Sequence, residues 1–279
     1  MVEGREAQAE RVRSAAGINA GGGYWDQRAA GFREGVQQRG GETAEVLGII
    51  SPFLTSSSTV LDVGAGVGRY TIPLAKQAAR VTAVEPSTGM RGYLEEDART
   101  AGLTNVTVVL SAWEAANVEP CDIVLCSHVV YFISGIRAFL EKVRDNARGQ
   151  VFMAIRTNQR DAALRELWEI VHKEPRVPEP GLMDLYPTLR QVLGVTANVQ
   201  VVTYGGGRNP LGRFDSVEDA MPEVRRQLLL AEGSPSESAA LVYLRERMVQ
   251  EDGKWVLPSM TVANAVVWWD NRSGSRNLA

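Results

Sequence analysis

Residues 60–75 read VLDVGAGVGRYTIPLA: a short apolar run, then Gly64, Gly66 and Gly68 at alternate positions, then a segment with helical patterning. Glycine adopts positive φ without strain and has no Cβ, so the backbone of such a turn can approach a ligand closely. A helix that begins directly after the turn offers unpaired N–H groups and a partial positive charge to an anionic group. This stretch therefore predicts a buried strand, a ligand-binding turn and a helix.

Apolar runs with helical segments between them continue on both sides of this turn. The runs that we interpret as strands cover residues 59–64, 80–85, 106–111, 122–130, 150–156, 198–205 and 261–269. The clearest helical segments between the first five runs cover residues 69–78, 90–102 and 136–147. Short apolar strands that alternate with helices are typical of a parallel sheet covered on both faces, and right-handed crossovers make that sheet doubly wound. We expect an α/β fold with a seven-stranded, mostly parallel sheet whose last strand is antiparallel.

The second half of the chain adds helical segments around the last two strands. They cover residues 161–174, 182–193, 216–233 and 236–250. The expected division is an N-terminal helical lid (1–45), a cofactor-binding core (46–157), a helical insertion (158–195), the sixth and seventh strands with a helical cap insertion (196–270, cap 205–259) and a tail (271–279). The glycines at 205–207 form a candidate hinge. Arg208 and Arg213 after it either bind a substrate carboxylate or lie solvated in a loop.

Composition limits the classes of function. The 279 residues have a formal net charge of -3, which disfavours a phosphate backbone as the main partner. The N-terminus lacks the apolar segment of a secretory signal, and no apolar stretch reaches the roughly 18 residues that span a bilayer. Cys121 and Cys126 are interpreted as buried thiols, the alternative being a disulfide or metal site, and with two histidines we expect no metal. We therefore expect a cytoplasmic protein without a membrane partner.

An acidic residue ends the second predicted strand. Glu85 follows Gly64 by 21 residues, and in a doubly wound sheet that strand end lies beside the glycine turn at the edge where ligands bind. A carboxylate there can accept hydrogen bonds from both hydroxyls of a ribose. Strand, turn, helix and acidic strand end together predict an adenosine-type cofactor. The alternative is a tight turn with a surface glutamate.

Four segments together resemble one enzyme family. DVGAGVGRYT (62–71) resembles the first motif of class I S-adenosylmethionine-dependent methyltransferases, and it differs from the G-x-G-x-x-G of nicotinamide enzymes. VEPSTGM (84–90) and CDIVLCSHVVYF (121–132) resemble the segments at the second and fourth strands of that family. YWDQRA (24–29) resembles the aromatic-acidic segment that often precedes the fold in its small-molecule branch. The resemblance extends over residues 23–156.

The resemblance implies a set of cofactor contacts for S-adenosyl-L-methionine. Those expected at its methionine part are Gly64, Ala65, Gly66 and Asp62, where Asp62 either braces the loop or receives the ammonium group through water. Those expected at its nucleoside are Glu85 on the ribose and Pro86, Met90, Ala112 and Trp113 around the adenine. Tyr24, Ser127 and His128 complete the expected set. The family often has an acidic residue at the turn after the third strand, whereas here the nearest is Glu114.

His128 is the candidate catalytic residue. It ends the fourth predicted strand, where the methyl group should point, and it is a general base, a wall of the cofactor pocket or a core residue. Transfer from a sulfonium needs a base only if the nucleophile must lose a proton. His172 is expected in the last turn of a helix, near the surface. Trp25 is either part of a lid over the cofactor or an ordinary packing residue.

These observations predict an S-adenosyl-L-methionine-dependent methyltransferase that acts on a small-molecule acceptor. Methylation of RNA or protein is an alternative, and so is a non-catalytic adenosylmethionine-binding protein on the same fold. A nicotinamide-dependent oxidoreductase is disfavoured by the glycine spacing. No nucleic-acid partner is expected, and the sequence leaves the acceptor atom and the oligomeric state open.

Overall fold

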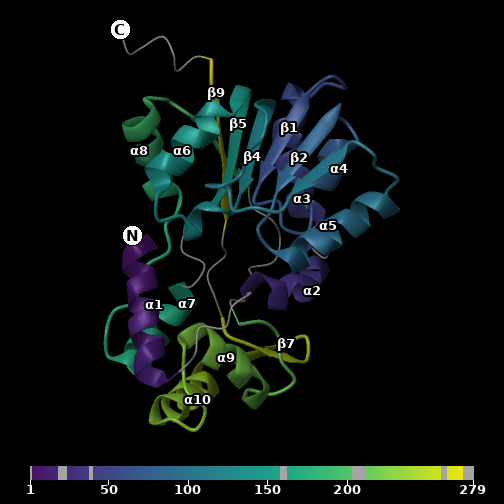
Figure 1. Cartoon of the computed structure of the whole chain (residues 1–279). Coiled ribbons are helices and arrows are strands. Elements are labelled where there is room, and N and C mark those ends of the chain that lie inside the picture. The colour runs from purple at the N-terminus through teal and green to yellow at the C-terminus, as the bar shows by residue number, and fades with distance from the viewer. Residues whose placement is uncertain are drawn as a thin grey trace. The chain divides into compact units, whose positions relative to one another are not determined.

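The computed structural model describes residues 2–17, 24–37, 40–157, 162–202, 211–258 and 263–272 (Figure 1). The chain divides into two compact units. We call the first the core unit (22–157, 181–204 and 263–279) and the second the helical unit (1–21, 158–180 and 205–262). Each unit has its own hydrophobic cluster of buried side chains, and each is described by itself.

The core unit contains one seven-stranded sheet. Its strands are β1 (Thr59–Val63), β2 (Arg80–Val84), β3 (Val106–Val109), β4 (Cys121–Ser127), β5 (Ala147–Arg156), β6 (Asn198–Val202) and β9 (Asn264–Asp270). They are ordered β3-β2-β1-β4-β5-β9-β6. Strands β1 to β5 pair in parallel, while β9 lies antiparallel between β5 and β6. The predicted fold class, including the antiparallel last strand, is confirmed.

Helices cover both faces of this sheet (Figure 1). The helices of the core unit are α2 (Tyr24–Gln37), α3 (Gly40–Ile50), α4 (Thr71–Ala75), α5 (Thr88–Thr100), α6 (Ile136–Asp145) and α8 (Leu182–Leu193), with short 3-10 turns η1 (Ser51–Phe53) and η2 (Val130–Phe132). Apolar side chains of α6 and α8 pack on one face, and those of α3 and α4 pack on the other. Strands that are buried on both faces explain the continuous apolar runs of the sequence.

Side-chain alternation along each strand sends neighbouring residues to opposite faces. Trp269 is 2% exposed and packs with α6 and α8, whereas Trp268 stacks on Phe152 at 6.5 Å within the opposite cluster. In β1, Leu61 belongs to the first cluster and Val60 to the second. The carboxyl ends of β1, β2, β4 and β5 lie at one edge of the sheet because these strands are parallel, and this edge holds the candidate site.

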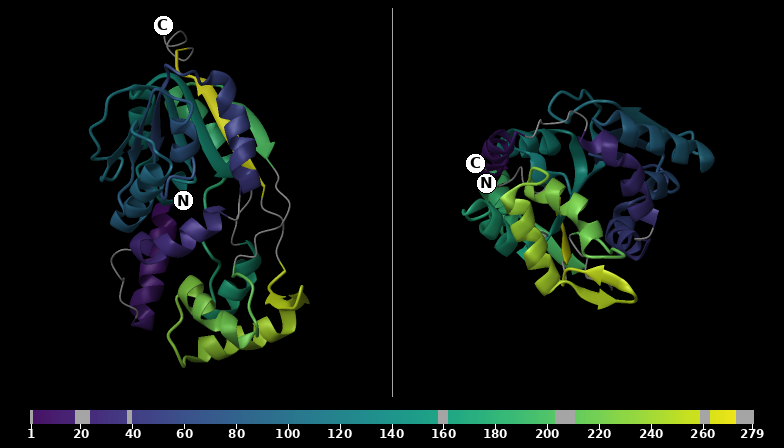
Figure 2. Two further views of the ribbon diagram at one scale, coloured as in Figure 1. Left: turned by 90° about the vertical axis from the view of Figure 1, so that its right-hand side faces the viewer. Right: turned by 90° about the horizontal axis from the view of Figure 1, so that it is seen from below.

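The helical unit has no strand in the main sheet among its described residues. It contains α1 (Val2–Ala16), α7 (Ala162–His172), η3 (Glu218–Ala220), α9 (Met221–Leu228), α10 (Pro235–Arg247) and a hairpin of β7 (Val249–Glu251) and β8 (Lys254–Val256). Buried leucines of α7, α9 and α10 pack around Trp168, and Val12 of α1 joins them. The green and yellow helices and hairpin of the C-terminal half lie together in both views of Figure 2.

The observed division differs from the expected one. Residues 22–45 belong to the core unit, while residues 1–21 group with the segments 158–180 and 205–262. The hairpin was not predicted: β7 takes the end of the helix expected over 236–250, and Asp252 and Gly253, with φ of 48° and 73°, form its turn. The candidate hinge at 205–207 and Arg208 lie outside the described residues. Across the described helices, none is long and apolar enough to span a membrane.

Candidate active site

The glycine turn joins β1 to α4 as the sequence predicted. Gly64, Gly66 and Gly68 have φ of +70°, +58° and +86°, which a residue with a Cβ rarely adopts. At Gly64 there is also no room for a side chain, since a Cβ would lie 2.5 Å from Cγ2 of Val129. The backbone N–H groups of Gly64 and Ala65 both donate to the carbonyl of Val84, at 2.8 and 3.1 Å, and so fix the turn to the end of β2.

Glu85 is bound directly to this turn. Its Oε2 accepts a hydrogen bond from the N–H of Gly66 at 2.8 Å, and its Oε1 accepts one from the N–H of Ser87 at 2.8 Å. Burial raises the pKa of Glu85, while these two backbone hydrogen bonds oppose the rise. An ionised carboxylate has about four lone-pair sites, so each oxygen keeps acceptor capacity beyond the bond to the backbone. The geometry therefore holds a rigid, buried acceptor pair beside the glycine turn.

Helix α2 is attached to the same loop through a residue that the sequence interpretation did not assign a role. Oδ1 of Asp26 accepts hydrogen bonds from Oγ of Ser87 at 2.5 Å and from the N–H of Gly89 at 2.8 Å. The Ser87 and Gly89 hydrogen bonds hold the pKa of Asp26 below its usual value. A Cβ on Gly89 would lie 3.2 Å from Cα of Asp26, so the glycine allows this close approach. The acidic residue of YWDQRA was the available signal.

Aromatic side chains of α2 lie over the turn. Phe32 has its Cε1 3.6 Å from the position of a Cβ on Gly66. Trp25 contacts Phe32 and Phe132 edge-on, with ring centroids 6.2 and 5.5 Å apart. Phe132, which follows β4, is 51% exposed. Trp25 and Phe32 of α2 and Phe132 of η2 thus form what we call the aromatic rim at the carboxyl edge.

Other residues of the expected cofactor set lie around this edge with different surroundings. Met90 is buried against Ala29 and Val67 under α2, and Pro86 is exposed between Glu85 and Ser87. Ala112 is exposed, but the ring of Trp113 packs against Phe139 in the main core, with centroids 6.5 Å apart. The ring of Trp113 therefore lies in the core, and the expected adenine contacts of Ala112 and Trp113 stay predictions. Tyr24 begins α2, and its side chain lies outside the described part of the chain.

Asp62 is fully buried on β1. Its Oδ2 accepts a hydrogen bond of 2.6 Å from Oγ1 of Thr71, the first residue of α4. Burial raises the pKa of Asp62 to about 6, with the charge of Glu85 acting in the same direction and the Thr71 hydrogen bond opposing it. This contact ties the strand before the glycine turn to the helix after it, which corresponds to the bracing role among the two that were expected.

His128 lies directly after β4, beyond the half-buried Ser127, in an unusual conformation. Its φ is +58°, a left-handed value that residues other than glycine rarely adopt. Its Nδ1 is 2.9 Å from the hydroxyl of Tyr131, and its Nε2 is 3.6 Å from Oε1 of Glu42. Burial lowers the pKa of His128 to about 4, opposed by the Glu42 carboxylate that faces its Nε2. Glu42 was missed in the sequence because it has no neighbouring motif and lies in the first turn of α3.

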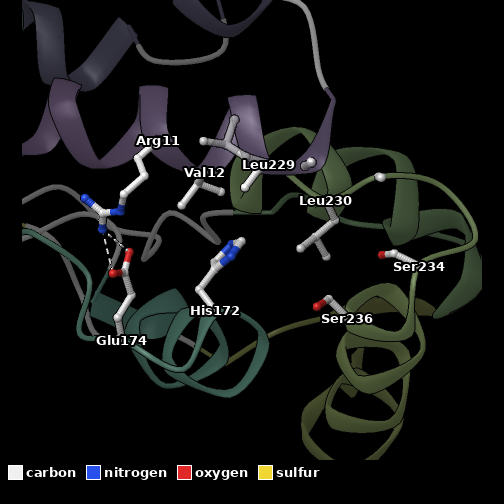
Figure 3. Close-up of a pocket in the computed structure, with 11 residues that line it drawn as sticks. Arg11, Val12, His172, Glu174, Leu229, Leu230, Ser234 and Ser236 are labelled. Carbon is white, nitrogen blue, oxygen red and sulfur yellow. Dashed lines mark hydrogen bonds and ion pairs between the residues drawn. The ribbon is translucent and has the colours of Figure 1, made fainter.

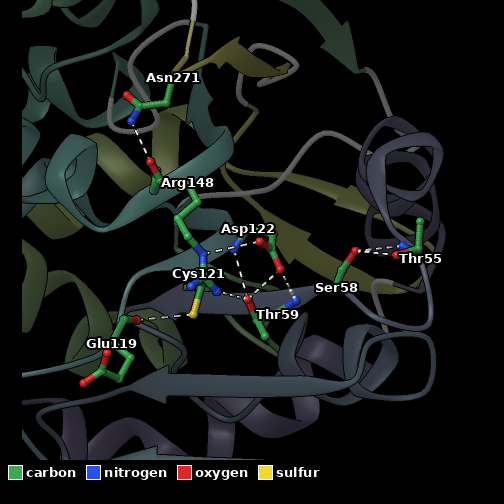
Figure 4. A network of polar contacts seen from close by, with 9 residues as sticks. Thr55, Ser58, Thr59, Glu119, Cys121, Asp122, Arg148 and Asn271 are labelled. Carbon is green, nitrogen blue, oxygen red and sulfur yellow. Dashed lines mark hydrogen bonds and ion pairs between the residues drawn. The ribbon is translucent and has the colours of Figure 1, made fainter.

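The two cysteines lie near opposite ends of β4, and only Cys121 lies away from this edge. Cys126 is fully buried, and Cys121 begins β4, at the opposite end of that strand from His128. Around Cys121, Thr59, Asp122 and Arg148 form a polar network that ties the starts of β1 and β4 together (Figure 4). Both thiols are unbridged, and the described residues contain no cluster of three potential metal ligands.

The helical unit has a pocket of its own, of about 570 Å³ (Figure 3). Val12, Leu229 and Leu230 form apolar walls, and the ion pair of Arg11 with Glu174 lies at one end. His172, the last residue of α7, points into it, with its Nε2 2.6 Å from the carbonyl of Leu228. None of the residues expected to bind a cofactor lines this pocket. Arg213, a candidate for substrate binding, contacts Glu251 and Asp252 of the hairpin turn.

Comparison with known proteins agrees with the motif. Residues 60–150 match the family model of a methyltransferase domain. A Haemophilus influenzae protein of uncharacterized function is 26% identical over 255 residues, which are 88% of each chain. A candidate methyltransferase from Bacillus halodurans has a similar structure, with a TM-score of 0.53 and 14% identity, over 82% of this chain and 97% of that one.

A magnesium protoporphyrin IX methyltransferase from Synechocystis, solved with S-adenosylhomocysteine, is less similar. Its TM-score is 0.47 at 19% identity, over 63% of this chain and 78% of that one. The matched segment, residues 60–150, contains the glycine turn, Glu85 and His128. Residues 60–150 thus form a methyltransferase domain, and the seven-stranded sheet is the Rossmann-like fold that the predicted resemblance to class I S-adenosylmethionine-dependent methyltransferases implies.

Proposed function

We propose that the carboxyl edge of the sheet binds S-adenosyl-L-methionine between the glycine turn and Glu85, and that the enzyme methylates a small molecule. The observation that supports this most is the hydrogen bond from Gly66 to Glu85, which brings the two sequence features to one point. The remaining acceptor capacity of the carboxylate suits two ribose hydroxyls. Gly64 and Gly66 allow the methionine part to lie against backbone.

The aromatic rim suits the cationic sulfur of the cofactor. Faces of tryptophan and phenylalanine attract cations, by about 0.5–2 kcal/mol depending on solvent exposure. Trp25 and Phe32 belong to α2, which the Asp26 contacts hold to the loop after β2. The side chain of Phe32 therefore shields the glycine turn from water. Exclusion of water and alignment of the reacting atoms are the main contributions a protein makes to this reaction.

The bound cofactor supplies an activated methyl group and a neutral leaving group, so a strong protein nucleophile is not needed. An in-line displacement then requires that the acceptor atom approach the methyl group from the side opposite the sulfur. The residues of this chain bind the nucleoside, hold the methionine end against the turn and close the aromatic rim. The net charge of -3 supports an acceptor other than a nucleic acid.

A transfer assay tests the acceptor class. The purified protein is incubated with S-adenosylmethionine labelled on the methyl group and with three fractions of a cell extract: small molecules, RNA and protein. We expect label in the small-molecule fraction and none with the Glu85→Ala variant. Label in RNA or protein contradicts the proposed acceptor class. Binding of the cofactor without label in any fraction contradicts catalysis.

A further inference from the structure

A buried to half-buried polar cluster surrounds the end of β4 in the core unit. Its members come from separate segments of the chain and lie at the carboxyl edge: Glu42, Arg69, His128, Tyr131, Arg156 and Asn264. Glu42 is held from two sides, by Nη2 of Arg69 at 2.9 Å and by Nδ2 of Asn264 at 3.0 Å. Burial alone would raise the pKa of Glu42, but the facing imidazole of His128 and the paired guanidinium of Arg69 lower it well below its usual value. Glu42 is therefore a carboxylate at neutral pH.

Tyr131 and Glu42 face the two ring nitrogens of His128 and together favour one tautomer. The Tyr131 hydroxyl oxygen accepts the backbone N–H of Arg156 at 2.8 Å. The same hydroxyl lies 2.9 Å from Nδ1 of His128 and can donate its proton there when Nδ1 is unprotonated. The Glu42 carboxylate faces Nε2 with its Oε1 at 3.6 Å, and its negative charge favours the ring proton of a neutral imidazole on Nε2, which leaves Nδ1 to accept from Tyr131. Both nitrogens of His128 are therefore turned toward protein groups.

The charges around the ring favour its neutral form. Arg156, stacked on Tyr131 with its guanidinium carbon 4.1 Å from the ring centroid, and Arg69 both oppose protonation of His128, as does burial. Glu42 favours protonation, but its charge is already paired with Arg69. The described groups that face His128 from the elements around it are thus one carboxylate, two guanidinium groups and one phenol. A base at this position would need a nitrogen lone pair directed at the acceptor.

The backbone of His128 has a second consequence. Residues other than glycine in the left-handed region are strained and persist only where their surroundings hold them. The turn at His128 (φ +58°) places the next residue, Val129, against the glycine turn, where its Cγ2 occupies the space that a Cβ on Gly64 would need. The imidazole contacts to Tyr131 and Glu42 are the side-chain bonds available to hold that turn.

We propose that Glu42 and Tyr131 fix His128 as the neutral Nε2–H tautomer, and that His128 acts as a positioning residue that holds Val129 against the glycine turn and accepts no proton from the acceptor. This inference rests on the proposed function of that turn in cofactor binding. It assigns Glu42 and Tyr131 a role that the sequence motifs do not show, and it argues against the general-base alternative for His128.

Nitrogen NMR of the two histidines tests the tautomer without any cofactor. In protein labelled with 15N-histidine, His172→Gln assigns the signals. We expect His128 to show a protonated Nε2 and an unprotonated Nδ1, and to remain neutral down to about pH 5. Tyr131→Phe should shift the Nδ1 signal, while Tyr186→Phe, which removes a tyrosine hydrogen bond to Ala197 elsewhere in the core unit, should not. A protonated Nδ1, or titration near the ordinary pKa of about 6.5, overturns the proposal.

Calorimetry with S-adenosylhomocysteine tests the positioning role. Asparagine adopts left-handed backbone conformations readily, and its amide can accept from Tyr131 and donate toward Glu42. We expect His128→Asn to keep the dissociation constant within about threefold and His128→Ala to raise it about tenfold, since only alanine loses both contacts. Equal affinity of both variants and the wild type contradicts positioning. Absence of binding by the wild type would instead contradict the proposed function and leave the NMR result valid.

Discussion

Ser87 connects Asp26 to Glu85: its hydroxyl donates to Asp26 at 2.5 Å, and its backbone N–H donates to Glu85 at 2.8 Å. Ser87, in the loop after β2, thus holds both the first turn of α2 and the carboxylate assigned to the ribose. The loop that follows β2 is therefore shared by the proposed cofactor site and by the attachment of the helix that covers the turn. This arrangement leads to a prediction about α2.

Asp26→Ala should loosen α2. The variant removes the acceptor for Ser87 and for the N–H of Gly89, so we expect amide hydrogens of residues 26–37 to exchange about tenfold faster. Because hydrogen bonds lower the pKa of Asp26, its contribution is present above the unfolded pKa of about 3.8 and is lost as pH falls further. Glu34→Ala, at an exposed position of the same helix, is the control. Equal exchange in both variants would show that Asp26 does not hold α2.

Gly64→Ala should destabilise the core unit. The left-handed φ costs about 1–2 kcal/mol for alanine, and the overlap with Val129 adds about 1–3 kcal/mol of overpacking. Val129→Ala removes the overlap with the new Cβ. The double variant should therefore recover the stability lost to overpacking and still lack the stability lost to the left-handed backbone. Urea unfolding of the two single variants and the double variant measures this. Additive losses would mean that Val129 does not limit the turn.

Asp62 should make stability depend on pH. Its pKa is raised to about 6, so the folded protein keeps a proton that the unfolded chain loses near pH 4. The stability advantage of the protonated form is present at low pH and is lost as pH rises from about 4 through about 6, by up to about 3 kcal/mol. Asp62→Asn keeps an acceptor for Thr71 and cannot ionise. We expect the free energy of unfolding of this variant, measured in urea, to increase relative to that of the wild type between pH 4 and pH 7. A difference that stays constant over this range would contradict a buried, titrating Asp62.

Much of the sheet could be predicted because its determinants are local. Apolar runs buried on both faces mark the strands, and the glycines mark the turn. The bounds predicted for α8, residues 182–193, match the structure, since Gly194 with φ +69° ends the helix. The Asp252–Gly253 pair is also a local signal for the hairpin of β7 and β8, but the helical pattern before it was extended too far.

The rest depends on contacts between distant residues. Glu42 and Asn264 are 222 positions apart, and no spacing rule brings them together. Trp113 has the sequence position of an adenine contact, whereas its ring packs in the core beside Phe139. The grouping of residues 1–21 with 158–180 and 205–262 likewise follows from packing around Trp168, which periodicity does not reveal.

The central claim is that the bonded pair of Gly66 and Glu85 forms the nucleoside site, and titration calorimetry of Glu85→Ala with S-adenosylmethionine tests it most directly. Loss of charge-assisted hydrogen bonds to both ribose hydroxyls should weaken binding about a hundredfold or more. Glu95→Ala, an exposed glutamate on α5 that pairs with Arg91, should bind like the wild type. Near-normal affinity of Glu85→Ala, with a folded protein confirmed by circular dichroism, would contradict the account.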